Sequence, residues 1–223
     1  MQLPFEQFPA LSAIKICRHV FIQRIPGIDV LHDKAEVLER LDAAHREIRN
    51  ATGFGDWPLF TAEQIHGNEI AVIDRCSRGP VGREFPACDG IITNQRSVAL
   101  GIYVADCCAV YMVDPATPAI GLVHSGRKGT ELGVVPNAIR QMIERFGSDP
   151  ANMIVQLSPC IRPPHYEVDF ASEIIQQCRA LGVQRLHDSG TCTACDLGRY
   201  YSYRAEKGKT GRMLAVVGLH PTN

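Results

Sequence analysis

The sequence predicts an α+β fold, a single domain over residues 1–223 in which mixed β-sheets are flanked by helices. Short runs of β-branched and aliphatic residues recur along the chain with turn residues between them, as expected for strands. Stretches with helical spacing of apolar residues are interspersed irregularly, which disfavours a regular βαβ repeat. With 223 residues, 45% of them hydrophobic and 21% charged, the chain can bury a sizeable core without disulfide support.

The first elements are predicted from strand composition and helix capping. Residues 14–23 form an apolar strand candidate. Asp33 is expected to cap a helix, because Glu36 follows it at capping-box spacing. The helix should end near Gly53, since glycine readily adopts the left-handed conformation found after helix C-termini. Its apolar face consists of Val37, Leu41, Ala44 and Ile48.

Residues 59–66 and 69–74 have strand composition and are separated by Gly67-Asn68. A short connection of this kind is a strong signal for a tight hairpin turn. We therefore expect a β-hairpin here, with His66 at the end of its first strand.

The second half contains further strands and two helices. Four strands are predicted at residues 90–93, 98–104, 109–113 and 119–124. A loop at residues 125–129 should lead into a helix that contains Pro136, which fits only a first helical turn or a kink. A strand at 153–158, a helix at 170–181 and a final strand at 213–219 complete the prediction.

The net charge and the composition limit the classes of partner that we expect for the chain. The formal net charge is −1, so nucleic acid and anionic membranes are not expected as general partners. No apolar run approaches the ~20 residues of a membrane-spanning helix. The nine cysteines are odd in number and scattered, and the N-terminus lacks a secretory pattern. We therefore expect reduced thiols and a cytoplasmic location; the oligomeric state is left open.

Three residues that can ligate a metal lie at the ends of predicted apolar elements: His66, Cys107 and His124. Two imidazoles and one thiolate form a plausible zinc set, and three protein ligands that leave a fourth position open are typical of a catalytic site. The three residues are far apart in sequence, so no local ligand motif applies. A histidine at a strand end is also compatible with an ordinary polar position.

Two carboxylates and two cations accompany this set. Asp106 and Asp89 are candidates for proton transfer, although a regular strand would point Asp106 away from Cys107, and Asp89-Gly90 also suits a simple turn. In the predicted loop 125–129, Arg127 and Lys128 are candidates for holding phosphate, with solvated surface positions as the alternative.

A Cys-x-x-Cys pair occurs at Cys192 and Cys195 in a polar segment. Such a pair is compatible with redox chemistry or zinc, but no second pair of this kind and no pair of histidines lies near it in the sequence. We therefore expect two incidental thiols, and a surface position for His165.

Several segments, taken in order, resemble the YfiH/YlmD-like or laccase-domain family, which includes purine nucleoside phosphorylases. They are Gln64-Ile65-His66-Gly67, Asp89-Gly90-Ile91-Ile92-Thr93, Val104-Ala105-Asp106-Cys107, the run from Gly121 to Thr130, Tyr166-Glu167-Val168, Cys192-Thr193, Ser202-Tyr203-Arg204 and Thr210-Gly211-Arg212. The resemblance implies an α+β fold similar to that of a deamidating toxin domain with a Cys/His pair.

The resemblance also implies a zinc ion held by residues matching His66, Cys107 and His124. It implies phosphorolysis of adenosine, inosine and methylthioadenosine, together with adenosine deamination, at one site that takes a nucleoside and phosphate. Some members of the family are associated with editing of peptidoglycan precursors. Arg24 and Arg204 are additional candidates for binding phosphate.

The sequence departs from the family pattern at two places. Arg127-Lys128 replaces a Trp-Arg pair, so a lysine would bind phosphate as a point charge rather than as a bidentate fork. The N-terminal motif is reduced to residues 23–27. Two other readings therefore stay open: a hydrolase in which Cys107 is the nucleophile and His124 its base, and a non-catalytic protein.

The number and spacing of the histidines indicate whether the chain could be a multicopper oxidase of the laccase type. A four-copper oxidase needs many imidazoles, characteristically in His-x-His pairs, whereas this chain has eight histidines and no such pair. A single site with two imidazoles and one thiolate could still hold copper in vitro, because affinity for divalent copper generally exceeds that for zinc.

Overall fold

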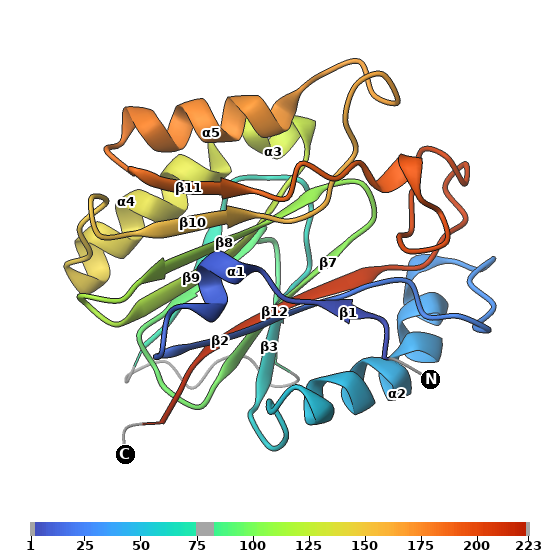
Figure 1. Cartoon of the computed structure of the whole chain (residues 1–223), viewed down its shortest axis with the longest axis horizontal. Coiled ribbons are helices and arrows are strands. Elements are labelled where there is room, and N and C mark those ends of the chain that lie inside the picture. The colour runs from blue at the N-terminus through green and yellow to red at the C-terminus, as the bar shows by residue number, and fades with distance from the viewer. Residues whose placement is uncertain (1–2, 75–82, 222–223) are drawn as a thin grey trace.

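Two β-sheets pack against each other, and helices cover their outer sides (Figure 1). The computed structural model of the chain describes residues 3–74 and 83–221. Within these residues each sheet has six strands, in the order β1-β2-β12-β7-β3-β5 and β11-β10-β8-β9-β6-β4. Figure 1 shows α2 below the first sheet, and α3, α4 and α5 above the second. This arrangement confirms the α+β class with mixed sheets flanked by helices.

The first sheet is mainly antiparallel, but β3 runs parallel to both of its neighbours, β7 and β5. Its strands are β1 (Phe5–Glu6), β2 (Cys17–Ile22), β3 (Leu59–Ala62), β5 (Glu84–Phe85), β7 (Ala99–Val104) and β12 (Met213–Leu219).

The second sheet is also mixed, with parallel pairs at its two edges, β4 with β6 and β10 with β11. Its strands are β4 (Ile70–Ile73), β6 (Gly90–Thr93), β8 (Cys108–Asp114), β9 (Ala119–Ser125), β10 (Ile154–Leu157) and β11 (Arg185–Asp188). The two-residue strands β1 and β5 and the largely exposed β11 were missed in the sequence, because they carry too little apolar pattern.

The helices begin and end where local signals place them, with one exception. Asp33 Oδ1 accepts a hydrogen bond from the Glu36 amide (3.0 Å), which confirms the predicted cap of α2. The helix expected after residue 129 is divided instead, because Gly133 adopts a left-handed conformation (φ 71°) between α3 and α4. The helices are α1 (Pro9–Ser12), α2 (Lys34–Ala51), α3 (Arg127–Glu131), α4 (Val134–Phe146), α5 (Phe170–Ala180) and the 3₁₀ turn η1 (Thr193–Cys195).

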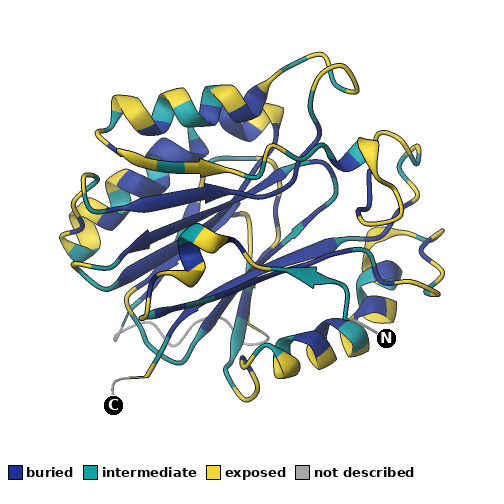
Figure 2. Cartoon of the chain, in the orientation of Figure 1, coloured by how far each residue is buried: buried dark blue, intermediate teal, exposed yellow. Residues whose placement is uncertain are grey.

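The core explains why the central strands read as continuous apolar runs. All residues of β8, β9 and β12 are buried, as the dark strands in Figure 2 show. One apolar cluster fills the space between the sheets and under α2, and a second lies between the β8–β9–β10 face and the helices α4 and α5. The buried Tyr111 hydroxyl joins the sheets by donating to the Val20 carbonyl (3.0 Å).

The predicted hairpin at Gly67-Asn68 is wrong, because β3 lies in the first sheet and β4 in the second. The connecting segment is held by bonds to segments other than β4. The backbone N–H of Gln64 donates to the Cys88 carbonyl (3.0 Å), and its side-chain amide exchanges two hydrogen bonds with the backbone of Tyr103 on β7. The backbone N–H groups of His66 and Gly67 donate to the Asp89 carboxylate.

The chain crosses from the first sheet to the second three times: between β3 and β4, between β5 and β6, and at the turn between β7 and β8. The three crossings carry His66, Asp89 and Cys107, which meet beside the C-terminal end of β9. None of the described helices is long and apolar enough to cross a membrane. The eight cysteines within the described ranges are all free thiols, as expected.

Candidate active site

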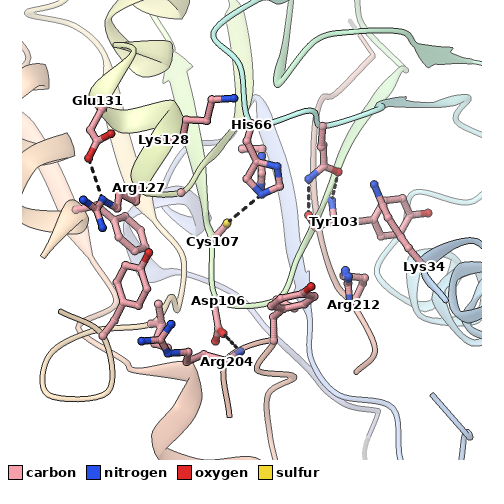
Figure 3. A pocket seen from close by; sticks show the side chains of 18 residues that line it. Lys34, His66, Tyr103, Asp106, Cys107, Arg127, Lys128, Glu131, Arg204 and Arg212 are labelled. Atoms are coloured by element: carbon pink, nitrogen blue, oxygen red, sulfur yellow. Dashed lines mark hydrogen bonds and ion pairs between the residues drawn. The ribbon is translucent and has the colours of Figure 1, made fainter. Parts of the chain in front are cut away.

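The three predicted ligands meet at this end of the sheets. His66 comes from the β3–β4 crossing, Cys107 from the β7–β8 turn, and His124 from the end of β9. One ligand atom from each lies within 4.8 Å of the others, and His66 Nε2 is 3.9 Å from Cys107 Sγ. Figure 3 shows the His66 ring and the Cys107 sulfur directed toward each other. The structure thus brings together residues that are 41 and 17 positions apart in the sequence.

Asp89, which is completely buried at the start of β6, organises the cluster. Its Oδ1 accepts hydrogen bonds from His124 Nδ1 (2.9 Å) and from the His66 amide (2.8 Å). Its Oδ2 accepts from the Gly67 amide (2.6 Å). Because Nδ1 of His124 is engaged, Nε2 is the nitrogen left to face Cys107 and His66. A carboxylate that fixes a histidine in this way is common behind metal sites. Burial opposes ionisation of Asp89, but its hydrogen bonds outweigh burial and lower its pKa.

Three residues beside or in the cluster have left-handed backbone conformations, which no local sequence pattern predicted. Gln64, His66 and Asp106 have positive φ angles of 64°, 62° and 81°. Gly126 lies so close to Cys107 that a Cβ at this position would come within 2.6 Å of the sulfur. Glycine is therefore required at this position for Cys107 to reach the cluster.

Asp106 contacts backbone and side-chain donors rather than the cluster. Its Oδ1 accepts from the Thr193 hydroxyl (2.7 Å) and its Oδ2 from the Arg204 amide (2.7 Å). Both oxygens are thus engaged in joining the β7–β8 turn to the C-terminal segment. These contacts favour a positioning role for Asp106 over the expected role in proton transfer. The contacts of Asp89 likewise favour a positioning role for that residue.

Cys107 and His124 shift each other's ionisation. Burial raises the pKa of the Cys107 thiol, but the charge of His124 and hydrogen bonds from both histidines outweigh burial and lower the pKa to about 6. Burial lowers the pKa of His124, but Cys107 and Asp89 together raise it to about 9. At neutral pH without a metal, the two groups therefore form a thiolate–imidazolium pair.

The donor set fits a metal ion with borderline-soft preferences. Two imidazole nitrogens and a thiol with a low pKa supply three of the four ligands that zinc takes in catalytic sites. The same donors would also accept copper. The residues therefore agree with the expected metal centre, and the structure leaves the identity of the metal open.

A cavity of about 700 Å³ opens beside the cluster, and the cluster forms part of its wall. Aromatic side chains contribute another part through Tyr103, Tyr166, Phe170 and Tyr203. Five basic side chains but only two carboxylates line it: Lys34, Arg127, Lys128, Arg204 and Arg212 against Asp106 and Glu131. A positively charged cavity of this size suits a small anionic ligand together with an aromatic one.

Two of the five basic residues of the cavity form ion pairs with carboxylates, and three do not. Arg127 pairs with Glu131 (2.9 Å) and Glu167 (3.7 Å), and Arg204 pairs with Glu167 (3.2 Å). Among the described residues, no carboxylate lies within 4.0 Å of the charged nitrogens of Lys34, Lys128 or Arg212. Desolvation and the charge of Arg212 lower the pKa of Lys34. An anion between Lys34 and Arg212 would offset the repulsion between the two cations and would stabilise the charged form of Lys34.

Lys34 and Arg212 line the cavity although no sequence pattern predicted them, whereas the predicted Arg24 lies outside its lining. Lys34 opens α2 and Arg212 precedes β12, and neither belongs to a recognisable binding motif. Arg24 is not among the residues that line the cavity. Its guanidinium instead pairs with Glu206 (2.6 Å) and lies 4.3 Å from the ring centre of Tyr201, so it is committed to structural contacts.

Comparison with known proteins places these features in a family. The family model described as multi-copper polyphenol oxidoreductase laccase matches residues 27–173 and 168–220. A protein of Bacillus subtilis named purine nucleoside phosphorylase YlmD is 28% identical over 71% of this chain and 69% of its own. A purine nucleoside phosphorylase of Streptomyces coelicolor is 31% identical over 79% of this chain and 81% of its own.

The fold is shared with solved structures. The crystal structure of YlmD from Geobacillus stearothermophilus superimposes with a TM-score of 0.82 at 23% identity, covering 99% of this chain and 100% of that one. The crystal structure of a Bacillus licheniformis protein YfiH gives a TM-score of 0.79 at 21% identity, over 97% and 99% of the two chains. Both similarities confirm the architecture described above.

The ionisation of Cys107 predicts a reactivity profile for the metal-free protein. Iodoacetamide should alkylate Cys107 with a midpoint at about pH 6, because the neighbouring imidazoles stabilise the thiolate. Mass spectrometry of the labelled peptide over a pH series measures this. The same cysteine in the denatured chain is the control and should titrate about 2–3 pH units higher. A native midpoint no lower than the denatured one would contradict the thiolate–imidazolium pair.

Proposed function

The chain belongs to the family described as multi-copper polyphenol oxidoreductase laccase, and we propose that within this family it is a purine nucleoside phosphorylase that uses zinc. The zinc would be held by His66, Cys107 and His124. The proposal rests on one observation above all: a single cavity combines this donor set, aromatic walls and three cations that make no ion pair with any described carboxylate. The names of the relatives in Bacillus and Streptomyces support the same activity.

Phosphate is proposed to bind among Lys34, Lys128 and Arg212. These are the cavity's free cations within the described residues, so an anion gains their attraction without breaking an existing ion pair. Arg212 already donates from Nη1 to the carbonyls of Thr210 and Gly211, which anchors its guanidinium at the cavity wall. Arg127 and Arg204 are neutralised by Glu131 and Glu167, and we leave them out of this phosphate site.

The purine is proposed to lie against the aromatic wall. Tyr203 is exposed (54% of the residue's surface), and Tyr166 and Phe170 add apolar area to the cavity wall. An aromatic base can stack on such rings, while the ribose lies between the base and the cations. Adenosine, inosine and methylthioadenosine share this base-and-ribose framework, so we propose all three as substrates.

In phosphorolysis an oxygen of hydrogen phosphate attacks the ribose C1′ while the bond from C1′ to the purine nitrogen breaks. The proton that the phosphate gives up ends on the purine, which leaves as the free base. The cations would orient the phosphate toward C1′ and reduce the repulsion between the anion and the electron-rich ring system. Asp89 would hold His124 in one orientation, and Asp106 would keep the β7–β8 turn against the C-terminal segment. A bound zinc would supply Lewis-acid polarisation and water activation, which is also the basis for proposing adenosine deamination here.

A second candidate is supported by a specific arrangement. Cys107, His124 and Asp89 form the nucleophile, base and orienting carboxylate of a cysteine hydrolase, with a lowered thiol pKa of about 6. Such an enzyme would hydrolyse an amide, for example in a peptidoglycan precursor, without a metal. The names of the relatives favour the phosphorylase, whereas the cations would serve either enzyme, because amide hydrolysis also leaves an anion, the product carboxylate.

The direct test is incubation with inosine, adenosine and methylthioadenosine, with and without phosphate, followed by chromatography. We expect free purine base and a ribose 1-phosphate only when phosphate is present, and inosine from adenosine in either case. Cys107→Ala should abolish both reactions, because it removes the sulfur from the shared centre. Cys17→Ala, a buried cysteine in β2 outside the cavity, is the matched control. Near-normal rates in a folded Cys107→Ala protein would refute the shared site.

The phosphate site predicts a selective kinetic effect. Lys128→Ala and Arg212→Ala should each raise the KM for phosphate about tenfold or more, since each removes a charge-assisted contact. The KM for nucleoside should change less. Arg127→Ala provides the control and should change either constant by less than about threefold, because this arginine is exposed and already paired. Equal effects of all three substitutions would argue against the assigned phosphate site.

Metal removal separates the two candidates. Dialysis against EDTA should abolish phosphorolysis, and added zinc should restore it, because the imidazoles and thiolate alone supply no Lewis acid. Activity that survives chelation and is lost on covalent trapping of Cys107 by a peptide aldehyde would instead favour the hydrolase.

A further inference from the structure

A second cluster of metal-ligating side chains lies outside the cavity. It consists of His165, Cys192 and Cys195. We propose that this cluster is a second zinc site, structural in role, that joins the segment after β10 to the segment that contains η1. This inference goes beyond the proposed function, because it holds whichever reaction the cavity performs.

The distances are those of ligands that share one ion. His165 Nδ1 lies 3.7 Å from Cys192 Sγ and 3.6 Å from Cys195 Sγ, and the three atoms lie within 4.8 Å of one another. A tetrahedral zinc with bonds of about 2.0–2.3 Å separates its ligand atoms by about 3.4–3.8 Å. Both nitrogen-to-sulfur distances fall in this range. Two thiolates and an imidazole also match the donor preference of zinc better than that of magnesium or calcium.

The backbone places these ligands before any metal binds. Cys160 and Cys192 form a parallel bridge, in which the Cys160 amide donates to the Thr191 carbonyl and the Thr193 amide donates to the Cys160 carbonyl (both 3.2 Å). The turn of η1, closed by the Cys195 amide on the Cys192 carbonyl (3.2 Å), brings the second sulfur beside the first.

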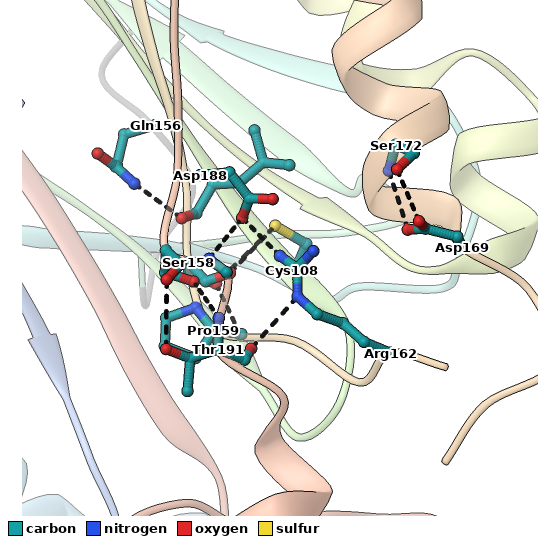
Figure 4. A network of polar contacts seen from close by, with 12 residues as sticks. Cys108, Gln156, Ser158, Pro159, Arg162, Asp169, Ser172, Asp188 and Thr191 are labelled. Carbon is teal, nitrogen blue, oxygen red and sulfur yellow. Dashed lines mark hydrogen bonds and ion pairs between the residues drawn. The ribbon is translucent and has the colours of Figure 1, made fainter. Parts of the chain in front are cut away.

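His165 is fixed from the other segment. Its amide donates to the Arg162 carbonyl (2.9 Å) in a turn. Figure 4 shows the Arg162 side chain reaching both Asp188 and Thr191, which ties the two segments together again. The structure thus gives the Cys-x-x-Cys pair a histidine neighbour that no local pattern indicates, because His165 lies 27 residues before Cys192 along the chain.

The proposed site has a clear mechanical consequence. Its two segments continue directly into the cavity wall: Tyr166 follows His165, and Thr193, between the two cysteines, donates to Asp106. A zinc here would hold the wall of the cavity in place. Because His165 and Cys195 are exposed, the ion can enter from solvent, and water would complete the fourth position.

Zinc stoichiometry tests the proposal. After saturation with ZnCl₂ and removal of excess metal, the wild-type chain should contain two zinc ions by elemental mass spectrometry. Cys107→Ser and Cys195→Ser should each contain one, and the double variant none. His187→Ala, an exposed histidine elsewhere, should retain two. The whole 223-residue chain is used throughout.

Cobalt distinguishes the sites by thiolate number. In Cys107→Ser the bound cobalt should show a sulfur-to-metal absorption about twice as intense as in Cys195→Ser, since two thiolates rather than one contribute. Zinc should also raise the Tm of Cys107→Ser but leave that of Cys107→Ser/Cys195→Ser unchanged. If Cys195→Ser proves unfolded, His165→Ala takes its place. This variant keeps both thiols, Cys192 and Cys195, and should likewise reduce the affinity for zinc.

The outcomes separate this proposal from the catalytic one. A single zinc that is lost in Cys107→Ser and kept in Cys195→Ser would overturn the second site and leave the proposed function standing. The opposite pattern would support the second site and refute zinc at the catalytic cluster. A Cys192–Cys195 disulfide in the purified protein, with no zinc bound at this site after reduction, would also overturn the second site.

Discussion

The carboxylate of Asp89 is the contact on which the candidate active site depends. It is fully buried, yet all of its described hydrogen bonds come from groups that shape the site: the His124 ring and the amides of His66 and Gly67. A buried carboxylate is tolerated only when such donors compensate for lost hydration. The same bonds hold the β3–β4 crossing in its left-handed conformation and select the His124 nitrogen that faces Cys107. One desolvated charge thus sets both the backbone and the ring orientation of the cluster.

The two-sheet architecture explains why the site forms at this end of the molecule. The chain crosses from the first sheet to the second three times there, so His66, Asp89 and Cys107 arrive on irregular segments, while His124 comes from a regular strand of the second sheet. Irregular backbone is where side chains from different layers can converge on one point. Asp89 fixes the β3–β4 crossing by accepting hydrogen bonds from its backbone. Asp106 fixes the C-terminal segment in a similar way, since its two oxygens accept hydrogen bonds from Thr193 and Arg204. The proposed second zinc would reinforce the same junction from outside.

The electrostatics of the cavity depend on which charges are already compensated. Arg127 and Arg204 line it, but their partners Glu131 and Glu167 cancel most of their field. Lys34, Lys128 and Arg212 carry charge that the nearby carboxylates leave exposed to a ligand. A cavity that combines this residual charge with a soft ligand cluster and aromatic rings has separate places for an anion, a metal and a planar base. That division of space is the physical basis of the proposed reaction.

Local patterns in the sequence determined those features that local interactions control. The cap at Asp33, the buried strands β8, β9 and β12 and the chemical identity of the His66, Cys107 and His124 donors could all be predicted, because they depend on propensity, periodicity and side-chain type. Only the tertiary structure decided the rest. It turned an apparent hairpin at Gly67-Asn68 into a crossing between sheets, and it brought Lys34 and Arg212 to the cavity. It also placed His165 beside Cys192 and Cys195, which follow it by 27 and 30 residues. These features depend on contacts between segments that are remote in sequence, and such contacts leave no periodic or local signal to read.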